Sequence, residues 1–170
     1  MDFDDELSPQ EDQTGSDELL SDDNLRLPAS ANPLVRLHAV RAWLKRKENE
    51  TRIDMGKAAL VLQELQVSTG SAPLRRRAYQ ELTERLQSQQ NAFQSAQERL
   101  TTYEKAGEML EDCVNHVTVG ERLLVEYYLQ IEDLIQTGLE ESNQATTPRL
   151  EALFEVQNRI ERVGVSYEED

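Results

Sequence analysis

Cysteine, aromatic residues and long apolar runs are scarce in this chain of 170 residues. Its single cysteine, Cys113, cannot form an internal disulfide or a cysteine-rich metal site. No stretch approaches the roughly 18 consecutive apolar residues of a membrane-spanning helix, so we expect no span. The first residues are acidic, unlike a secretory signal, which favours a cytoplasmic protein. Aromatics make up 5% of the chain, which leaves few side chains on which nucleic-acid bases stack.

Basic residues are also outnumbered. Eighteen Lys and Arg stand against 33 Asp and Glu, for a formal net charge of −15. Such a charge opposes binding to a phosphate backbone, so nucleic acid is not an expected partner. The sequence contains no glycine-rich phosphate loop, no Ser/His/Asp set and no cluster of metal-ligating residues. We therefore expect a protein that is not an enzyme and holds neither cofactor nor metal.

Charge divides the chain into segments. Residues 1–32 hold ten acids and one base, and such a segment buries too little apolar surface to offset the entropy of ordering it. We predict a disordered acidic tail over 1–32, a helical domain over 33–165 and a short acidic tail over 166–170. Residues 33–70 carry seven bases against four acids. An acidic segment is expected to lie near this basic helix, although exposed ion pairs contribute only about 0–1 kcal/mol each.

Two long helices are predicted first. Asn32 is a good N-cap, Pro33 suits the first helical position, and Ser68-Thr69-Gly70 is a stop signal. The second helix, which Ser71 can cap, carries the strongest pattern in the sequence. Nine of its eleven seam positions are apolar and recur at spacings of three and four over five heptads, which is typical of a coiled coil. These positions are Tyr79, Leu82, Leu86, Gln89, Phe93, Ala96, Leu100, Tyr103, Gly107, Leu110 and Val114.

Two shorter helices follow. A capping box, Thr118 to Glu121, begins the third helix, and Thr147 with Pro148 begins the fourth, which Gly164 can end. Short loops place neighbouring helices antiparallel. The predicted fold is all-α, a long antiparallel hairpin with two shorter helices forming a bundle at one end. The sequence leaves open whether the Tyr79–Val114 stripe packs within the chain or forms a homodimer with a second copy.

The acidic tail has an apolar pattern that suits binding to a protein partner. Large apolar residues alternate with its acids, and such segments fold onto partner grooves while the acids steer the encounter. The candidate binding residues of the tail are Phe3, Leu7, Leu19, Leu20 and Leu27.

Basic residues form a second candidate binding surface. Part of it lies on the first helix and part lies at the expected hairpin tip. An acidic partner or the protein's own tail is the expected ligand, the alternative being a simply solvated face. These residues are Arg41, Lys45, Arg46 and Lys47 on the helix, and Arg75, Arg76 and Arg77 at the tip.

One short stretch of the first helix offers a different function. Leu37-His38-Ala39-Val40-Arg41-Ala42 loosely resembles histidine phosphotransfer domains, in which an exposed histidine of a helical bundle carries phosphate beside a cation. The resemblance covers six residues, and Ala42 stands where that family normally has glycine. The sequence favours a non-enzymatic adaptor or assembly protein. The alternatives are a homo-oligomeric coiled-coil scaffold and phosphotransfer through His38.

Overall fold

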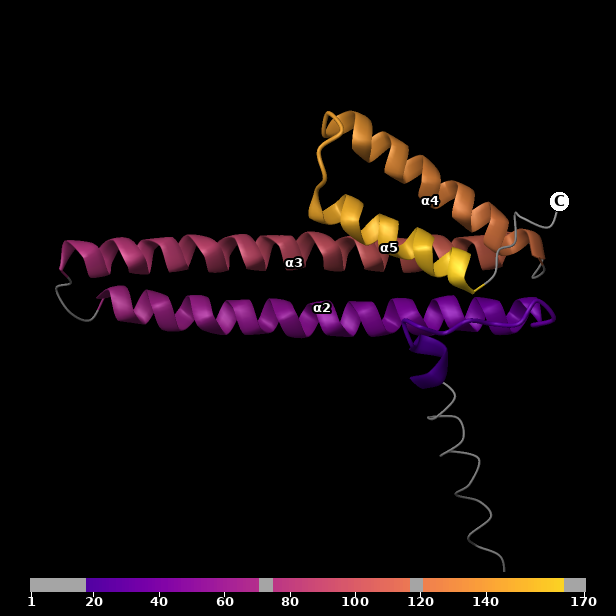
Figure 1. The fold of residues 1–170 in the computed structure, drawn as a ribbon, viewed down its shortest axis with the longest axis horizontal. Coiled ribbons are helices and arrows are strands. Elements are labelled where there is room, and N and C mark those ends of the chain that lie inside the picture. Colours follow the sequence, from indigo (N-terminus) through magenta and orange to yellow (C-terminus); the bar gives the residue numbers. More distant parts are fainter. Residues whose placement is uncertain (1–17, 71–74, 117–120, 164–170) are drawn as a thin grey trace, which may run out of the picture.

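The protein is all-α, as the sequence predicts. The computed structural model describes residues 18–70, 75–116 and 121–163. Within those ranges a short helical turn at 18–21 precedes four long helices, and no strand is present (Figure 1). The helices are α2 (Pro33–Gly70), α3 (Arg76–His116), α4 (Glu121–Glu141) and α5 (Pro148–Arg162). No helix of the described ranges is both long enough and apolar enough to span a membrane.

Two of the predicted helix starts are confirmed by their caps. The Leu34 N–H donates to Asn32 Oδ1 at 2.9 Å, and the Leu150 N–H donates to Thr147 Oγ1 at 3.2 Å. The first helix ends within the predicted stop, since α2 includes Ser68 and Thr69 and ends at Gly70. Ser68 is accommodated there because its hydroxyl donates to the Glu64 carbonyl of the same helix at 3.0 Å.

The other predicted helix ends lie outside the described residues. They are the Ser71 cap, the Thr118 side of the capping box and Gly164.

The two long helices pack against each other as an antiparallel hairpin (Figure 1). The residues of α2 that are buried in this seam recur every seven positions, and they are Leu37, Leu44, Thr51, Ala58 and Leu65. The α3 stripe lies opposite them, with Ala96, Leu100, Tyr103 and Leu110 buried. The stripe is therefore filled by α2 of the same chain. Of the two packings that the sequence left open for Tyr79–Val114, the described structure has the one within the chain.

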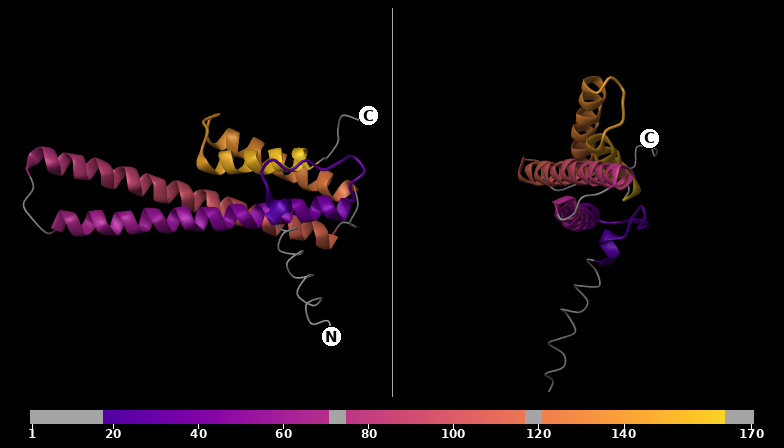
Figure 2. Two further views of the ribbon diagram at one scale, coloured as in Figure 1. Left: turned by 60° about the horizontal axis from the view of Figure 1, so that its bottom comes forward. Right: turned by 90° about the vertical axis from the view of Figure 1, so that its left-hand side faces the viewer.

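The two shorter helices cover one half of this hairpin. In Figure 1, α5 lies along α3 and α4 lies beyond α5, on the side away from α2. Figure 2 shows the same arrangement from the end of the hairpin. The close approach of α4 and α5 depends on Gly138, since a Cβ added there would lie 2.8 Å from Leu150 Cδ2. We call the covered part the bundle half. The remaining part, residues 53–70 and 75–95, is called the arm.

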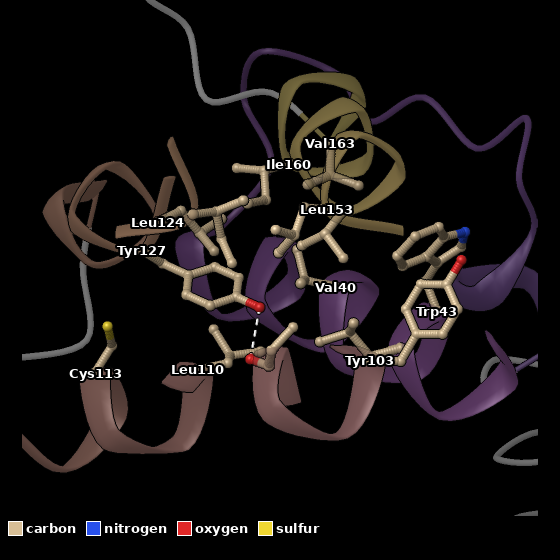
Figure 3. Close-up of a cluster of buried hydrophobic side chains, with 14 of the residues drawn as sticks. Val40, Trp43, Tyr103, Leu110, Cys113, Leu124, Tyr127, Leu153, Ile160 and Val163 are labelled. Atoms are coloured by element: carbon tan, nitrogen blue, oxygen red, sulfur yellow. Dashed lines mark hydrogen bonds between the residues drawn. The ribbon is translucent and has the colours of Figure 1, made fainter. Parts of the chain in front are cut away.

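The bundle half contains the hydrophobic core (Figure 3). Trp43 and Tyr103 meet edge to face, with ring centroids 6.1 Å apart. The buried hydroxyl of Tyr127 donates to the carbonyl of Ala106 at 2.7 Å and so joins α4 to α3. Phe154 of α5 is 42% exposed. The buried face of α5 is centred on Ala152, Val156 and Arg159, which excludes Phe154.

The connection between α4 and α5 is a Schellman-type turn. Asn143 and Gln144 adopt positive φ values of 54° and 67°. The Gln144 N–H donates to the Leu139 carbonyl at 2.8 Å, which satisfies a group left open at the helix end. Asparagine tolerates this left-handed backbone well, and the turn directs the chain back along α3.

Candidate functional site

The second half of the predicted disordered tail is docked on the bundle half. Residues 18–32 run beside α2 and reach α5 (Figures 1 and 2). Leu20, Leu25 and Leu27 are partly buried against the core. The sequence predicts a tail that is disordered when free, and the described structure places residues 18–32 of it on the folded helices, which supply apolar contacts and cations that a free segment lacks. We call residues 18–27 the acidic segment.

A buried arginine of α5 binds the backbone of the acidic segment. Arg159 is 2% exposed, and its guanidinium donates to the carbonyls of Leu20 and Asp22, the latter at 2.6 Å. A further bond runs to the Ala39 carbonyl of α2 at 3.4 Å. Burial lowers the pKa of Arg159 to about 10, which still leaves the group charged at neutral pH. Its Nε has no hydrogen-bond partner among the described residues.

The carboxylate of Asp23 is held by three side chains of α2. Trp43 Nε1 donates to Asp23 Oδ1 at 2.8 Å, and the cations of Lys47 and Arg46 lie 3.5 and 3.7 Å from its oxygens. Lys47 also stands over the indole of Trp43, 5.5 Å from the ring centroid. Burial alone would raise the pKa of Asp23, but the bond from Trp43 and the two cations outweigh it and hold the pKa below its ordinary value.

Further arginines fix the neighbouring backbone. Arg46 donates to the Ser21 carbonyl at 2.8 Å, and Arg162 donates to the Asp23 carbonyl at 3.3 Å. We call Trp43, Arg46, Lys47, Arg159 and Arg162 the docking face.

Arg36 binds the chain that follows the acidic segment. Its guanidinium donates to the carbonyls of Pro28 and Ala29 at 2.9 and 3.1 Å, and to that of Val163 at the end of α5. The arginines in and beside the docking face therefore bind the neighbouring backbone mostly through its carbonyl groups.

The structure divides the predicted basic surface on α2. Arg46 and Lys47 belong to the docking face, whereas Lys45 is exposed. Arg41 turns toward α3, where its guanidinium forms two bonds to the Glu111 carboxylate at 2.6 and 2.7 Å. Two of the four predicted helix cations thus meet the acidic segment.

The arginines of the hairpin tip lie far from the docking face. Arg75, Arg76 and Arg77 are exposed where α3 begins, at the opposite end of the hairpin. Arg77 is 3.6 Å from Glu81 on the same helix, and its side chain is 93% exposed. The fold therefore places the two parts of the predicted basic surface at opposite ends.

The predicted binding residues of the tail also differ in their burial. Leu20 and Leu27 pack against the core, while Leu19 is 67% exposed. Phe3 and Leu7 lie outside the described residues.

Sequence reasoning missed Trp43, Arg159 and Arg162 as parts of the site. One signal was present, since Arg159 stands beside Ile160 within the apolar pattern of the last helix, a position where an unpaired cation would be costly.

The groups that could support other chemistry are not assembled into a site. His38 is exposed on α2, and Arg41, the cation of the phosphotransfer resemblance, is engaged by Glu111. Burial raises the pKa of the Cys113 thiol, which makes it a poor nucleophile. No group of three or more His, Cys, Asp or Glu within the described ranges is arranged to hold a metal ion.

A groove lies where α4 diverges from α3. It encloses about 650 Å³, and its walls come from α3, α4 and the start of α5. Leu134, Leu150 and Leu153 provide its apolar part, and Lys105 and Glu141 lie among the residues that line it. The charged side chains that line this groove do not bind a common segment, whereas those of the docking face all contact the acidic segment.

Comparisons of the chain with protein-family models, curated proteins and solved structures found no match. The docking face, with a peptide segment already bound to it, is the best-defined candidate site of the described residues.

Proposed function

We propose that this chain is a non-enzymatic adaptor that exchanges its acidic segment between its own docking face and a protein partner. The observation that carries the proposal is the docked segment itself, in which Arg159, Arg46 and Trp43 bind backbone carbonyls and one carboxylate. These contacts support an acidic, leucine-bearing peptide as the ligand of the face.

The contacts that hold the acidic segment suit exchange. Most of the hydrogen bonds go to carbonyl groups, which every peptide has, so they select the turned backbone of residues 20–23 more than a particular sequence. The ion pairs of Asp23 are half exposed, and such pairs contribute at most about 1 kcal/mol each. The buried Nε–H of Arg159 has no partner in the described structure, so a ligand that supplied an acceptor to it would gain a hydrogen bond that the acidic segment does not make.

Two neighbouring leucines have different roles in this proposal. Leu20 anchors the acidic segment to the core, and Leu19, 67% exposed, faces away and remains open to a partner. Release would expose both leucines with their flanking acids to an apolar groove with a basic rim. Those acids would speed the encounter, because complementary charge raises association rates. The vacated docking face would form a second contact.

Exchange is tested with a fluorescein-labelled peptide of residues 16–31 added to the full chain. In Leu20→Ala the chain's own segment is weakened and the docking face is intact, so we expect the peptide to bind about 10-fold more tightly than to wild type. Arg46→Glu combined with Lys47→Glu reverses the charge of the face and should abolish binding. Fluorescence anisotropy measures each affinity.

Leu19→Ala is the matched control, since this leucine makes little contact with the bundle half. Its affinity for the peptide should equal that of wild type. Equal affinity for all four chains would refute exchange. Partner capture from the native cell adds the functional readout. A true partner that binds the exposed leucine must bind less to Leu19→Ala than to wild type, and an unchanged captured set would refute the adaptor role.

A further inference from the structure

The outer surface of α2 in the arm carries a row of exposed apolar side chains. Ile53, Leu60 and Val67 are 57%, 63% and 67% exposed, and their spacing of seven places them on one line along the helix. Gly56 lies between the first two, and a Cβ added there would meet no heavy atom of the described structure within 4 Å. This row is separate from the seam that α2 forms with α3, which contains Ala58 and Leu65.

We propose that a second copy of this chain covers the row, with the two α2 helices antiparallel and a two-fold axis beside Leu60. In this register Leu60 faces its own copy, and Ile53 faces Val67 of the second copy. The pattern is self-complementary, as a two-fold interface requires. It is a different face from the Tyr79–Val114 stripe, which α2 already fills.

Charge selects the antiparallel arrangement. If the row occupies the a positions of a heptad, Lys57 and Glu64 are both e positions and Arg52 is a g position. Antiparallel helices bring e against e, so Lys57 of each copy faces Glu64 of the other, which gives two attractive pairs. Parallel helices would instead bring Arg52, whose guanidinium lies 3.3 Å from Glu104 of α3 and 3.9 Å from Glu48, next to Lys57 of the other copy twice, and like charges in such positions repel.

The fold leaves space for the second copy. In this register residue 70 of one α2 faces residue 50 of the other, so the contact covers the arm. The α4 and α5 helices lie over the bundle half, on the far side of α3 (Figure 1). Three apolar residues from each copy form a small interface, which is typical of a reversible dimer rather than an obligate one.

The full chain is tested by sedimentation velocity over rising concentration. We expect the mass to increase from the monomer value of 19.5 kDa toward twice that value. Leu60→Glu places two like charges at the two-fold axis and should keep the chain monomeric throughout. Leu129→Glu is the control, because Leu129 is 46% exposed on α4 and lies off the row. Circular dichroism checks that each variant is folded. A monomeric wild type, or a dimer that survives Leu60→Glu, would overturn the proposal.

Orientation is tested by charge reversal. Lys57→Glu should weaken the antiparallel dimer, because two carboxylates then face each other, and adding Glu64→Lys should restore it. A parallel dimer would respond in the opposite way, since Lys57→Glu would then create an attractive pair with Arg52. Strengthening by Lys57→Glu alone would therefore exclude the proposed register.

Discussion

The bundle half and the arm share the same two helices but differ in how those helices are buried. Leu110, in the bundle half, is 1% exposed, whereas Leu86, also a seam residue but in the arm, is half-buried. The bundle half adds α5 and α4 to the seam, and a docked segment from the N-terminal side. The arm has one seam and an open outer face. Identical periodicity in a sequence therefore yields different stability, because burial depends on how many neighbours each helix has.

The largest expected difference between the two halves comes from shortening one leucine in each. Leu110→Ala should lower the free energy of unfolding by about 3 kcal/mol, since it leaves a cavity in a closed core. Leu86→Ala should cost about 1 kcal/mol, because the side chain is already partly in water. Urea unfolding followed by circular dichroism measures both losses. Equal losses would mean that the arm packs as tightly as the bundle half.

Glycine replacement should give opposite signs in the two halves. Gly56→Ala in the arm should stabilise the chain by about 1 kcal/mol, because alanine is the better helix former and open space surrounds the site. Gly138→Ala should destabilise it by about 1 kcal/mol, since the new methyl group would lie 2.8 Å from Leu150 Cδ2 and that clash outweighs the helical gain. Thermal melting of both variants checks the signs. Stabilisation by Gly138→Ala would show that α4 and α5 separate readily.

The smallest expected effect is release of the acidic segment by acid, which concerns the bundle half alone. The pKa of Asp23 is lowered in the folded protein, so its contribution to docking is present above its ordinary pKa of about 4 and is lost as pH falls through the lower folded value. Trp43 is the sole tryptophan, and its fluorescence should change over that range. Asp23→Asn should remove this transition. A transition that persists in the variant would assign it to another carboxylate.

Much of the fold follows from the sequence by elementary patterns. The Asn32 cap, the Thr147–Pro148 start and the α3 stripe from Leu82 to Val114 appear in the structure as predicted, whereas Tyr79, at the start of the predicted stripe, is 57% exposed. The partner of the stripe was not predictable, because one apolar edge suits a helix of the same chain and one of another chain equally. The second buried face of α2, with Ala39, Val40 and Trp43, was also missed. It depends on where α5 lands, which local periodicity does not encode.

The site was predictable in part. The basic character of the first helix and the acidic character of the tail indicated that the two might meet, and Asp23 does lie beside Arg46 and Lys47. Composition describes a segment in isolation, so it does not tell where residues 18–32 dock on the folded helices. Arg159 is separated from Asp22 by more than a hundred residues, so their contact follows from the tertiary fold alone.

The hydrogen bonds from Arg36 to the carbonyls of Pro28 and Val163 have a consequence for protein engineering. Arg36 holds the backbone just before α2 and just after α5. Proteins fused on either side of the helical part would therefore be attached close to each other. The arginine tip of the hairpin points the other way, at a distance set by α3, about 60 Å for its 41 residues. Energy transfer between fluorophores placed at these two ends would thus measure the length of the hairpin, and bending of the hairpin would change the transfer efficiency.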